Sequence, residues 1–345
     1  MIENILKTPG VLDNPILVVS GHGYNSGVSG IVCSRLVERF GKPTVVISIE
    51  DDIARASGRS VEGFSLYNAI DSCRELLTSF GGHDMAAGFT LPPSKIESFN
   101  ECVNAYYRSL SEPLPRRQLA ICAKIEFSDI GEQQISELLR LAPFGPKNEE
   151  PVFATLSARI EDISPLGGKH CRLTFEKRGK KLRVTMFNKK PEELFFNPGD
   201  VVDIAYVLSL YSPQKDRLCV SAKLKHIVPE GFSKEDFRTL DIFDRMQLEQ
   251  ELTEQERSDI APSREDMAQV YRSVKNKPLD ADDQERIYHR FSGMAPGRAA
   301  AAIQALKELG IFVEKFDGRR RLVADASSAK RELEKSAVYA KLHGI

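Results

Sequence analysis

The sequence predicts three domains of different fold class: an α/β domain, an all-β barrel and a mostly helical domain. Short apolar strands alternate with amphipathic helices near the N-terminus, several short strands separated by turn residues follow, and helical segments lead into a hairpin near the C-terminus. A chain of 345 residues is long enough for two or three independent cores. The predicted boundaries are residues 1–13 for a lead-in, 14–111 for the α/β domain, 115–229 for the barrel, 230–262 for an acidic linker and 263–345 for the C-terminal domain.

The α/β domain begins with a buried strand, a glycine-rich segment and a helix. The strand covers Ile16–Ser20, the glycine-rich segment Gly21–Gly30 and the helical spacing Ile31–Phe40, with a second strand at Thr44–Ser48. A glycine-rich loop before a helix start presents free backbone N–H groups to an anion. The spacing matches neither the Walker nor the dinucleotide fingerprint. The segment therefore predicts either a phosphate site or a structural connection.

Two further glycine-bearing segments carry basic side chains. Arg59 lies between small residues, where its guanidinium could fork onto a phosphate, and a surface arginine paired with Glu62 is the alternative. An amphipathic helix over Leu66–Phe80 leads to the pair Gly81-Gly82 and then to His83. Adjacent glycines permit a close approach of ligand to backbone. We interpret this stretch as a pocket whose imidazole meets a phosphate, with a plain turn as the alternative.

Three motifs resemble the DHHA1 domain of the RecJ family, the single-strand-specific DNA exonucleases of bacterial repair. They are Ser-Gly-Val-Ser-Gly-Ile-Val-Cys-Ser at residues 26–34, Ser-Gly-Arg-Ser-Val-Glu-Gly at 57–63 and Phe-Gly-Gly-His-Asp-Met-Ala-Ala-Gly at 80–88. The resemblance implies that the DNA backbone is contacted by Arg59, Ser60, Gly81, Gly82 and His83. The family usually has Trp-His where this chain has Tyr24-Asn25. Asn25 is therefore included among the expected contacts in place of that histidine.

The family holds its catalytic metals in a preceding DHH domain. This chain has six histidines, and none lies in an Asp-His-His triplet. Phosphodiester hydrolysis of this type needs metal ions held by converging carboxylates and imidazoles. We therefore expect no cofactor on this chain, Mn²⁺ or Mg²⁺ in a missing DHH domain, and no activity without that domain. A separate DHH polypeptide is a candidate partner.

The middle of the chain is predicted to form an OB-type barrel. A strand at Arg117–Phe127, a helix at Glu132–Leu141 and a Pro/Gly-rich turn up to Phe153 come first, and the turn also resembles RecJ. Short strands with turn signals and one helix suit an OB barrel, a fold whose face binds single strands. The predicted barrel strands are Ala154–Ile163, Cys171–Glu176, Leu182–Phe187, Val201–Leu208 and Leu218–Ile227.

The hairpin around Gly179 carries a basic strip with an aromatic residue. Alternation turns Leu173, Phe175, Leu182, Val184 and Met186 inward, and Arg172, Lys181, Arg183 and Phe187 outward, with Arg178 and Lys180 at the turn and Lys169, Lys177, Lys189 and Lys190 nearby. A single-strand groove needs charge for the backbone and a flat ring for the bases. We therefore predict single-stranded DNA as the ligand, gripped in a groove between the first two domains. Solvated lysines on a sheet edge are the alternative.

The C-terminal part changes in character after Pro229. Residues 230–262 are acid-rich and predict a linker with helical pieces. Helices at Asp266–Ser273, Ala281–Phe291 and Gly297–Leu309, followed by strands that pair across Asp317-Gly318, predict a winged-helix-like domain. Its three arginines at Arg319–Arg321 could contact phosphates, but winged helices serve equally as docking units for proteins such as repair factors.

Bulk properties exclude several other classes. The net charge is −1, and no apolar stretch reaches membrane-spanning length or resembles a signal peptide, so we expect a cytoplasmic protein without a membrane partner. The six cysteines form no Cys-x-x-Cys pair and predict neither a zinc site nor a disulfide framework.

The sequence thus favours the DNA-binding C-terminal half of a 5′-to-3′ RecJ-like exonuclease of DNA repair and recombination. A non-catalytic binding module that stands alone is one alternative. A DHHA1-type phosphodiesterase for oligonucleotides or cyclic dinucleotides is another, as is a relation to alanyl-tRNA synthetases. The OB-like strands and the RecJ-like turn argue against both the phosphodiesterases and the alanyl-tRNA synthetases.

Overall fold

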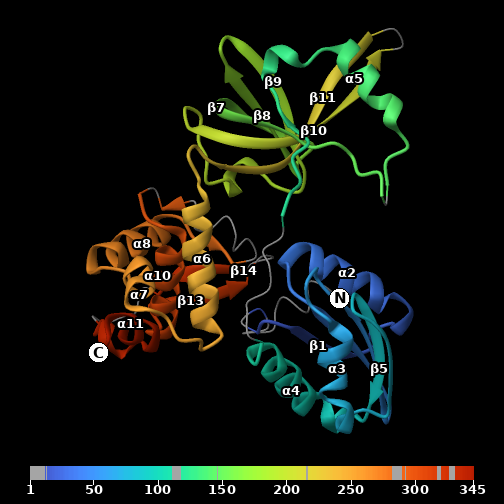
Figure 1. Cartoon of the computed structure of the whole chain (residues 1–345), viewed down its shortest axis with the longest axis vertical. Coiled ribbons are helices and arrows are strands. Elements are labelled where there is room, and N and C mark those ends of the chain that lie inside the picture. Colours follow the sequence, from blue (N-terminus) through green and yellow to red (C-terminus); the bar gives the residue numbers. More distant parts are fainter. Residues whose placement is uncertain are drawn as a thin grey trace. The chain divides into compact units, whose positions relative to one another are not determined.

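The structure is a computed structural model of the chain, and it describes residues 12, 14–110, 118–145, 147–214, 217–281, 290–291, 293–316, 320–325 and 331–345. The chain divides into two compact units, one of residues 118–234 and the other of the residues before and after them. The second unit contains an α/β part and a helical part (Figure 1). Among the described residues, no helix is long and apolar enough to cross a membrane.

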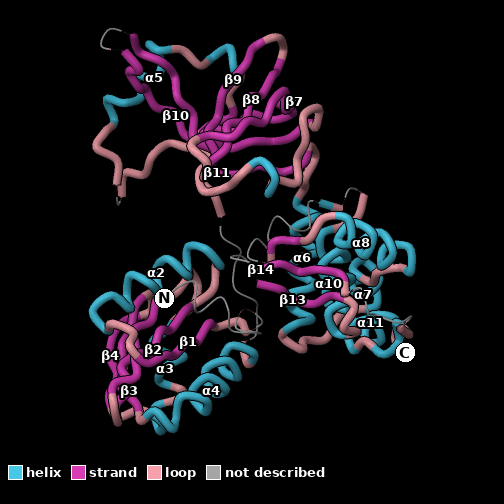
Figure 2. The backbone as a smooth tube through the Cα atoms, turned by 180° about the vertical axis from the view of Figure 1, so that it is seen from behind, coloured by secondary structure: helices cyan, strands magenta, loops and turns pink. Residues whose placement is uncertain are grey.

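The α/β part is a five-stranded sheet in the order β1-β2-β3-β5-β4. β1 (Leu17–His22) and β2 (Thr44–Glu50) are parallel and are connected by α2 (Ser26–Phe40), whereas β3 (Ile53–Arg59), β4 (Ser79–His83) and β5 (Ala86–Leu91) pair antiparallel. α2 packs Cys33 and Leu36 against one face of the sheet. The other face packs against α3 (Leu66–Asp71) and α4 (Ile96–Arg108), so the sheet lies between helices (Figures 1 and 2).

Two predicted elements of this part differ from the structure. Half of the expected glycine-rich segment is helical, because α2 begins at Ser26, directly after its N-cap Asn25. The expected helix over Leu66–Phe80 ends at Asp71, and a short 3-10 helix, η1 (Arg74–Leu76), leads into β4. Pairing of β4 with β5 takes Phe80 into the sheet, which is a tertiary effect that helical periodicity cannot show.

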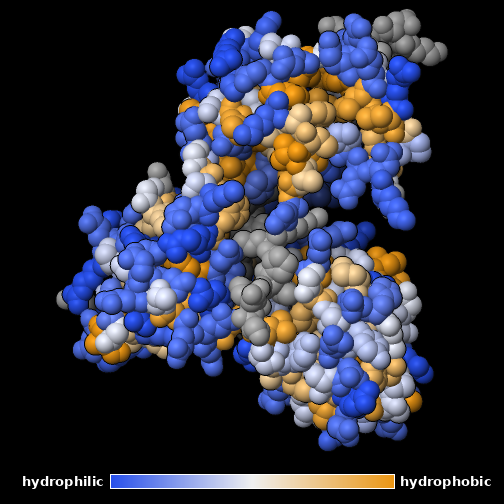
Figure 3. Space-filling view, viewed as in Figure 1, coloured by the Kyte–Doolittle hydropathy of each residue, from blue (hydrophilic) through white to orange (hydrophobic). Residues whose placement is uncertain are grey.

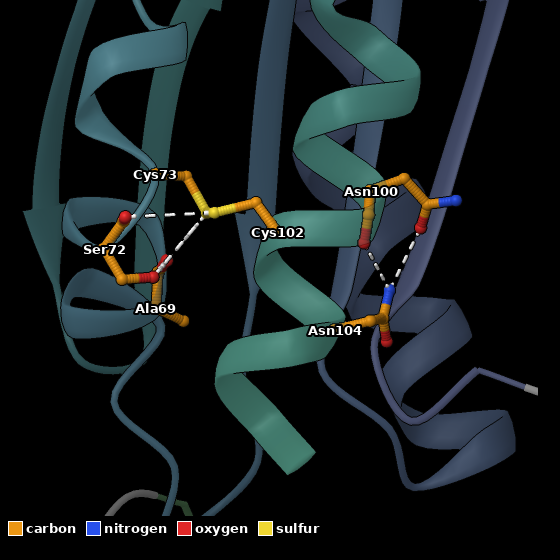
Figure 4. Close-up of a disulfide and its surroundings, with 6 residues drawn as sticks. All are labelled: Ala69, Ser72, Cys73, Asn100, Cys102 and Asn104. Atoms are coloured by element: carbon orange, nitrogen blue, oxygen red, sulfur yellow. Dashed lines mark hydrogen bonds between the residues drawn. A yellow bond between two sulfur atoms is a disulfide. The ribbon is translucent and has the colours of Figure 1, made fainter. Parts of the chain in front are cut away.

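A disulfide joins Cys73 to Cys102, which corrects the expectation that the cysteines form none (Figure 4). Cys73 follows α3 and Cys102 lies on α4, with Cα atoms 6.1 Å apart. The packing of α3 beside α4 brings together two residues that are 29 positions apart in the sequence. The spacing of the cysteines alone does not encode that proximity. Cys33, Cys122, Cys171 and Cys219 are free.

The unit of residues 118–234 is a closed five-stranded barrel in the order β7-β8-β9-β11-β10, with β10 pairing back to β7. The strands are β7 (Phe153–Leu166), β8 (His170–Lys177), β9 (Lys180–Met186), β10 (Val201–Gln214) and β11 (Arg217–Pro229). All neighbours are antiparallel except β9 and β11, which are parallel. This arrangement confirms the OB-type barrel.

The barrel interior is apolar, and the five inward residues predicted on β8 and β9 are all buried. Tyr206 is fully buried there, and its hydroxyl lies 2.7 Å from the hydroxyl of Thr155. Burial raises the pKa of Tyr206 to about 12. α5 (Glu132–Leu138) covers the core through Ile135. The predicted strand before it is reduced to β6 (Ala123–Lys124), and a 3-10 helix, η3 (Phe127–Asp129), follows.

The helical part includes the segment predicted as an acidic linker. That segment forms α6 (Lys234–Gln247) and α7 (Glu254–Ile260), whose buried residues join one core with α10 (Pro296–Glu308) and α11 (Ala337–His343). The prediction of a linker was therefore wrong. The many acidic residues of this segment obscured its amphipathic pattern in the sequence. Arginines of the same segment form ion pairs with some of these acids: Arg238 with Asp259, and Arg245 with Glu256.

A three-stranded sheet completes this part. α8 (Arg264–Asn276) leads into β12 (Leu279–Asp280), which pairs with β14 (Arg320–Ala324), and β14 pairs with β13 (Phe312–Phe316). β13 and β14 confirm the predicted hairpin, whose turn lies outside the described residues, as does most of the predicted helix Ala281–Phe291. A 3-10 helix, η7 (Leu333–Lys335), precedes α11.

Arg320 does not serve as a phosphate contact. Its side chain is 3% exposed, and its Nη1 lies 3.0 Å from Oε2 of Glu314. Lys307 of α10 pairs with the same carboxylate, so Glu314 ties the hairpin to that helix. Arg319 lies outside the described residues, and Arg321 is on β14 opposite Lys315.

We expect Gly297→Ala to destabilise the protein by about 3 kcal/mol or more, because overpacking against backbone forces helices apart. A Cβ at Gly297 would lie 2.0 Å from the carbonyl oxygen of Thr239, and the Gly297 amide donates to the Thr239 hydroxyl at 3.0 Å. Urea unfolding would measure the change. The control Gln304→Ala, on a partly exposed site of the same helix, should shift stability by less than about 0.5 kcal/mol. An equal loss of stability in Gly297→Ala and Gln304→Ala would contradict the close contact between Gly297 and Thr239.

Candidate nucleic-acid interface

The outer face of β8, β9 and β11 carries basic side chains in adjacent rows. Arg172 on β8 pairs with Thr185 on β9, and Thr185 pairs with Lys223 on β11. Arg183 pairs with Thr174 in the neighbouring row. Side chains of paired residues point to the same face of a sheet. Arg172, Arg183 and Lys223 therefore lie on one exposed surface, which we call the basic face of the barrel.

The cations of this region differ in whether an acid already neutralises them. Lys181 pairs with Glu161, and Lys177 pairs with Glu126 at 2.9 Å. Within the described part of the chain, no ion pair is formed by Arg172, Arg183 or Lys223. Among the described residues, these three charges therefore have no acid partner that competes with a phosphate.

Phe187 lies at one end of the basic face and is 49% exposed. The His170 ring contacts it edge-on with centroids 5.0 Å apart, and the Lys223 ammonium lies 5.5 Å from its centroid. The backbone amide of Asn188 donates to Nδ1 of His170 at 2.9 Å, which fixes the imidazole plane. The phenyl ring is thus held by its neighbours while half of it stays open, as a base-stacking platform requires. On the face of the barrel that Figure 3 shows, apolar residues lie among hydrophilic ones.

The remaining predicted barrel contacts lie at the tip of the β8–β9 hairpin. Arg178 and Gly179 form its two-residue turn, both with positive φ, and Lys180 begins β9. All three are exposed. The tip is at the opposite end of β9 from Phe187, so the structure separates these residues from the aromatic platform.

Lys223 was missed in the sequence analysis. The parallel pairing of β9 with β11 brings it beside Thr185 and Phe187, although about 40 positions of sequence separate them. Alternation along β11 held a usable signal, because Ala222 and Leu224 are buried and Lys223 between them is exposed.

The α/β part brings Arg59 and His83 to one face of its sheet. Both residues pair with Ala86 of β5, Arg59 from β3 and His83 from β4. Two strand spacings of about 4.8 Å place their backbones about 10 Å apart. Arg59 and His83 therefore lie on either side of Ala86 on one face of the sheet.

The Arg59 guanidinium lies over Gly30 of α2. Its Nη1 donates to the carbonyl of Gly58 at 2.8 Å, and a Cβ at Gly30 would lie 2.9 Å from its Nη2. Gly30 thus makes room for the guanidinium. The nearby thiol of Cys33 donates to the carbonyl of Ser57, and burial raises its pKa to about 11.

Asn25 and Ser60 have structural roles within the domain. The side-chain oxygen Oδ1 of Asn25 accepts from the backbone amide of Gly27 at 2.8 Å, so this side chain caps α2. Ser60 is 4% exposed, and its hydroxyl donates to the carbonyl of Phe64 at 2.8 Å. Burial thus removes Ser60 from the expected contact surface, while Asn25 stays exposed beside α2.

Gly81, Gly82 and His83 belong to strand β4, and the turn of this hairpin is Asp84-Met85. Gly82 has φ +145°, and a Cβ there would lie 2.4 Å from the Ala86 carbonyl oxygen. A Cβ at Gly81 would meet open space. His83 is exposed, so the structure gives an open strand end where the sequence suggested a tight pocket.

Metal ligands do not converge in the part of the chain that the structure describes, where no group of three His, Cys, Asp or Glu side chains could hold an ion. The RecJ resemblance assigns the metal centre to a DHH domain, so no metal site was expected among these residues.

Comparisons with known proteins match the α/β part and the barrel. Residues 13–109 match the family model of the DHHA1 domain, and residues 121–217 match that of the RecJ OB domain. The single-stranded-DNA-specific exonuclease RecJ of Bacillus subtilis is 34% identical over 206 residues, and that of Dickeya dadantii is 39% identical over 220 residues. The crystal structure of RecJ in complex with Mg²⁺ from Thermus thermophilus is 27% identical, has a TM-score of 0.57 and covers 68% of this chain.

The resemblance to the RecJ family is thereby confirmed over the DHHA1 and OB domains. The alignments take in 58% and 60% of this chain, but 26% and 37% of the Bacillus and Dickeya relatives. The chain thus corresponds to about a quarter to a third of the length of these relatives.

We expect Gly82→Ala to destabilise the protein by about 2–3 kcal/mol, because an alanine there is strained by its φ and clashes with backbone. Gly81→Ala is the matched control and should cost less than about 1 kcal/mol. Thermal and urea unfolding would measure both. A Gly82→Ala protein as stable as Gly81→Ala would show that the β4–β5 hairpin is built differently.

Proposed function

Given a DHHA1 domain followed by a RecJ OB domain, we propose that this chain is the single-stranded-DNA-binding part of a 5′-to-3′ RecJ-like exonuclease of repair and recombination. The observation that carries the proposal is the basic face of the barrel, where Arg172, Arg183 and Lys223 are exposed and unpaired by acids beside the half-open ring of Phe187. Cations bind any phosphate backbone, whereas a ring stacks on bases that are free of a duplex. The combination favours single strands.

The α/β part contributes a second contact in this proposal. Arg59 and His83 flank Ala86 on one face of the sheet, and small residues lie next to Ala86 on β5 (Ala87 and Gly88) and to His83 on β4 (Gly81 and Gly82). Side chains of this size let a phosphate approach the strand backbone, and the arginine and imidazole supply donors.

Hydrolysis belongs to a DHH domain outside these residues. The Thermus relative was crystallised in complex with Mg²⁺ and in complex with Mn²⁺, and such an ion would generate the attacking hydroxide and neutralise charge in the reaction. The present residues would hold and orient the strand. A DHH domain, on a separate polypeptide or on the same longer one, is the expected catalytic partner.

The helical part is proposed to be a winged-helix-like docking unit. The order of α8, β12, α10, β13 and β14, with β12 paired to β14, is consistent with that fold. α10 is buried over most of its length, and Thr239 of α6 covers its first turn at Gly297. A helix covered in this way is not open to a DNA groove, which favours a protein partner, such as a repair factor, over DNA.

A binding module without catalysis remains the second candidate. Both proposals place no metal centre on the described residues, so the lack of converging ligands there does not separate them. Mixing the chain with a DHH-domain protein distinguishes the two proposals, because only the exonuclease proposal expects the mixture to degrade single-stranded DNA.

We expect Arg183→Ala to weaken binding of a labelled oligothymidine several-fold and to flatten the slope of log K against log salt by about 0.7, the value for one phosphate contact on a single strand. Lys181→Ala is the matched control, and it should have less effect because Glu161 already pairs with Lys181. Fluorescence anisotropy at several salt concentrations measures both. Unchanged affinity and slope for Arg183→Ala would place the DNA elsewhere than the basic face.

A further inference from the structure

We propose that Tyr211 is a second base-stacking platform, so that a single strand crosses the barrel between Tyr211 and Phe187. The inference rests on the proposed function, because it assumes that the basic face binds single-stranded DNA. It adds the path of the strand and the number of nucleotides in contact.

Tyr211 lies on the same outer surface as the basic face. It pairs with Cys219 of β11, while Leu210 and Val220 in the adjoining row pack against the barrel core. Alternation therefore turns Tyr211 and Cys219 outward. The Tyr211 ring is 51% exposed, close to the 49% of Phe187, and these are uncommon values for large aromatic side chains.

The two rings lie at opposite ends of the parallel strands β9 and β11. Cys219, beside Tyr211, precedes Lys223 by four residues, and Phe187 follows Thr185, the partner of Lys223, by two. At about 3.3 Å per residue, the rings are separated by about 20 Å along the strands.

The surface between the rings suits a sugar–phosphate backbone. Ser221 and Lys223 are its outward residues on β11, and Arg183 and Thr185 those on β9. Hydroxyls and unpaired cations bind phosphates, whereas a protein partner that docked on two exposed rings would favour an apolar surface between them. The chemistry therefore favours nucleic acid as the occupant.

The separation also predicts a length requirement. A stacked strand advances about 3.4 Å per nucleotide, so about six nucleotides span both rings, which is within the range of 4–16 that OB folds cover. A shorter oligonucleotide can use one ring and the cations near it, but not both rings.

The test measures binding of oligothymidines of three, six and twelve nucleotides to the full chain and to Tyr211→Ala. We expect the variant to lose roughly tenfold in affinity for the twelve-nucleotide strand, the size of one lost stacking contact, and little for the three-nucleotide strand. Tyr211→Phe keeps the ring and should bind as the wild type does. Leu156→Ala, at another exposed apolar site (38% exposed), controls for loss of apolar surface and should also have no effect.

Two failures are distinguishable. If the wild type binds the twelve-nucleotide strand but Tyr211→Ala binds it equally well, the second platform is overturned and the proposed function stands. If the wild type binds none of the oligothymidines, the proposed function and this inference both fail. An equal loss for three and twelve nucleotides would also overturn the inference, because the two rings would then not act at a distance.

Discussion

Closure of the barrel is the constraint on which the candidate interface depends. β10 pairs back to β7, and β9 pairs with β11 in parallel over Val184 and Thr185. Closure buries the alternate residues of every barrel strand in one core. The same pairing sets Lys223 beside Thr185 and Phe187. A slip of one residue between β9 and β11 would turn Lys223 into the core and bury its charge. The apolar packing therefore also fixes the register of the interface.

Glycines act differently in the α/β part than their motif suggests. Gly30 provides space for the Arg59 guanidinium, and Gly82 avoids a clash with the backbone of Ala86 in a hairpin. Both shape the strand ends at which Arg59 and His83 lie, and neither forms a loop around an anion. The glycines thus position Arg59 and His83 indirectly. Because a glycine has no Cβ, the chain packs closely there, and this packing places the basic side chains.

Local patterns in the sequence predicted most strands and the inward residues of the β8–β9 hairpin, because alternation is a property of neighbouring residues. They did not predict features that depend on distant pairing. Lys223 reaches Phe187 through a parallel contact, Cys73 reaches Cys102 across two helices, and the acidic segment joins a helical core through α6. The family resemblance placed Ser60 among the DNA contacts, and only the fold shows that its hydroxyl is used internally.

The most direct test of the account is hydrogen exchange of the full chain with and without a twelve-nucleotide single strand. The account predicts slower exchange in β8, β9 and the first half of β11, the strands that carry Arg172, Arg183 and Lys223. A duplex of the same length should give much weaker protection, because paired bases cannot stack on Phe187. Protection confined to residues outside this barrel face, or equal protection by duplex and single strand, would contradict the account.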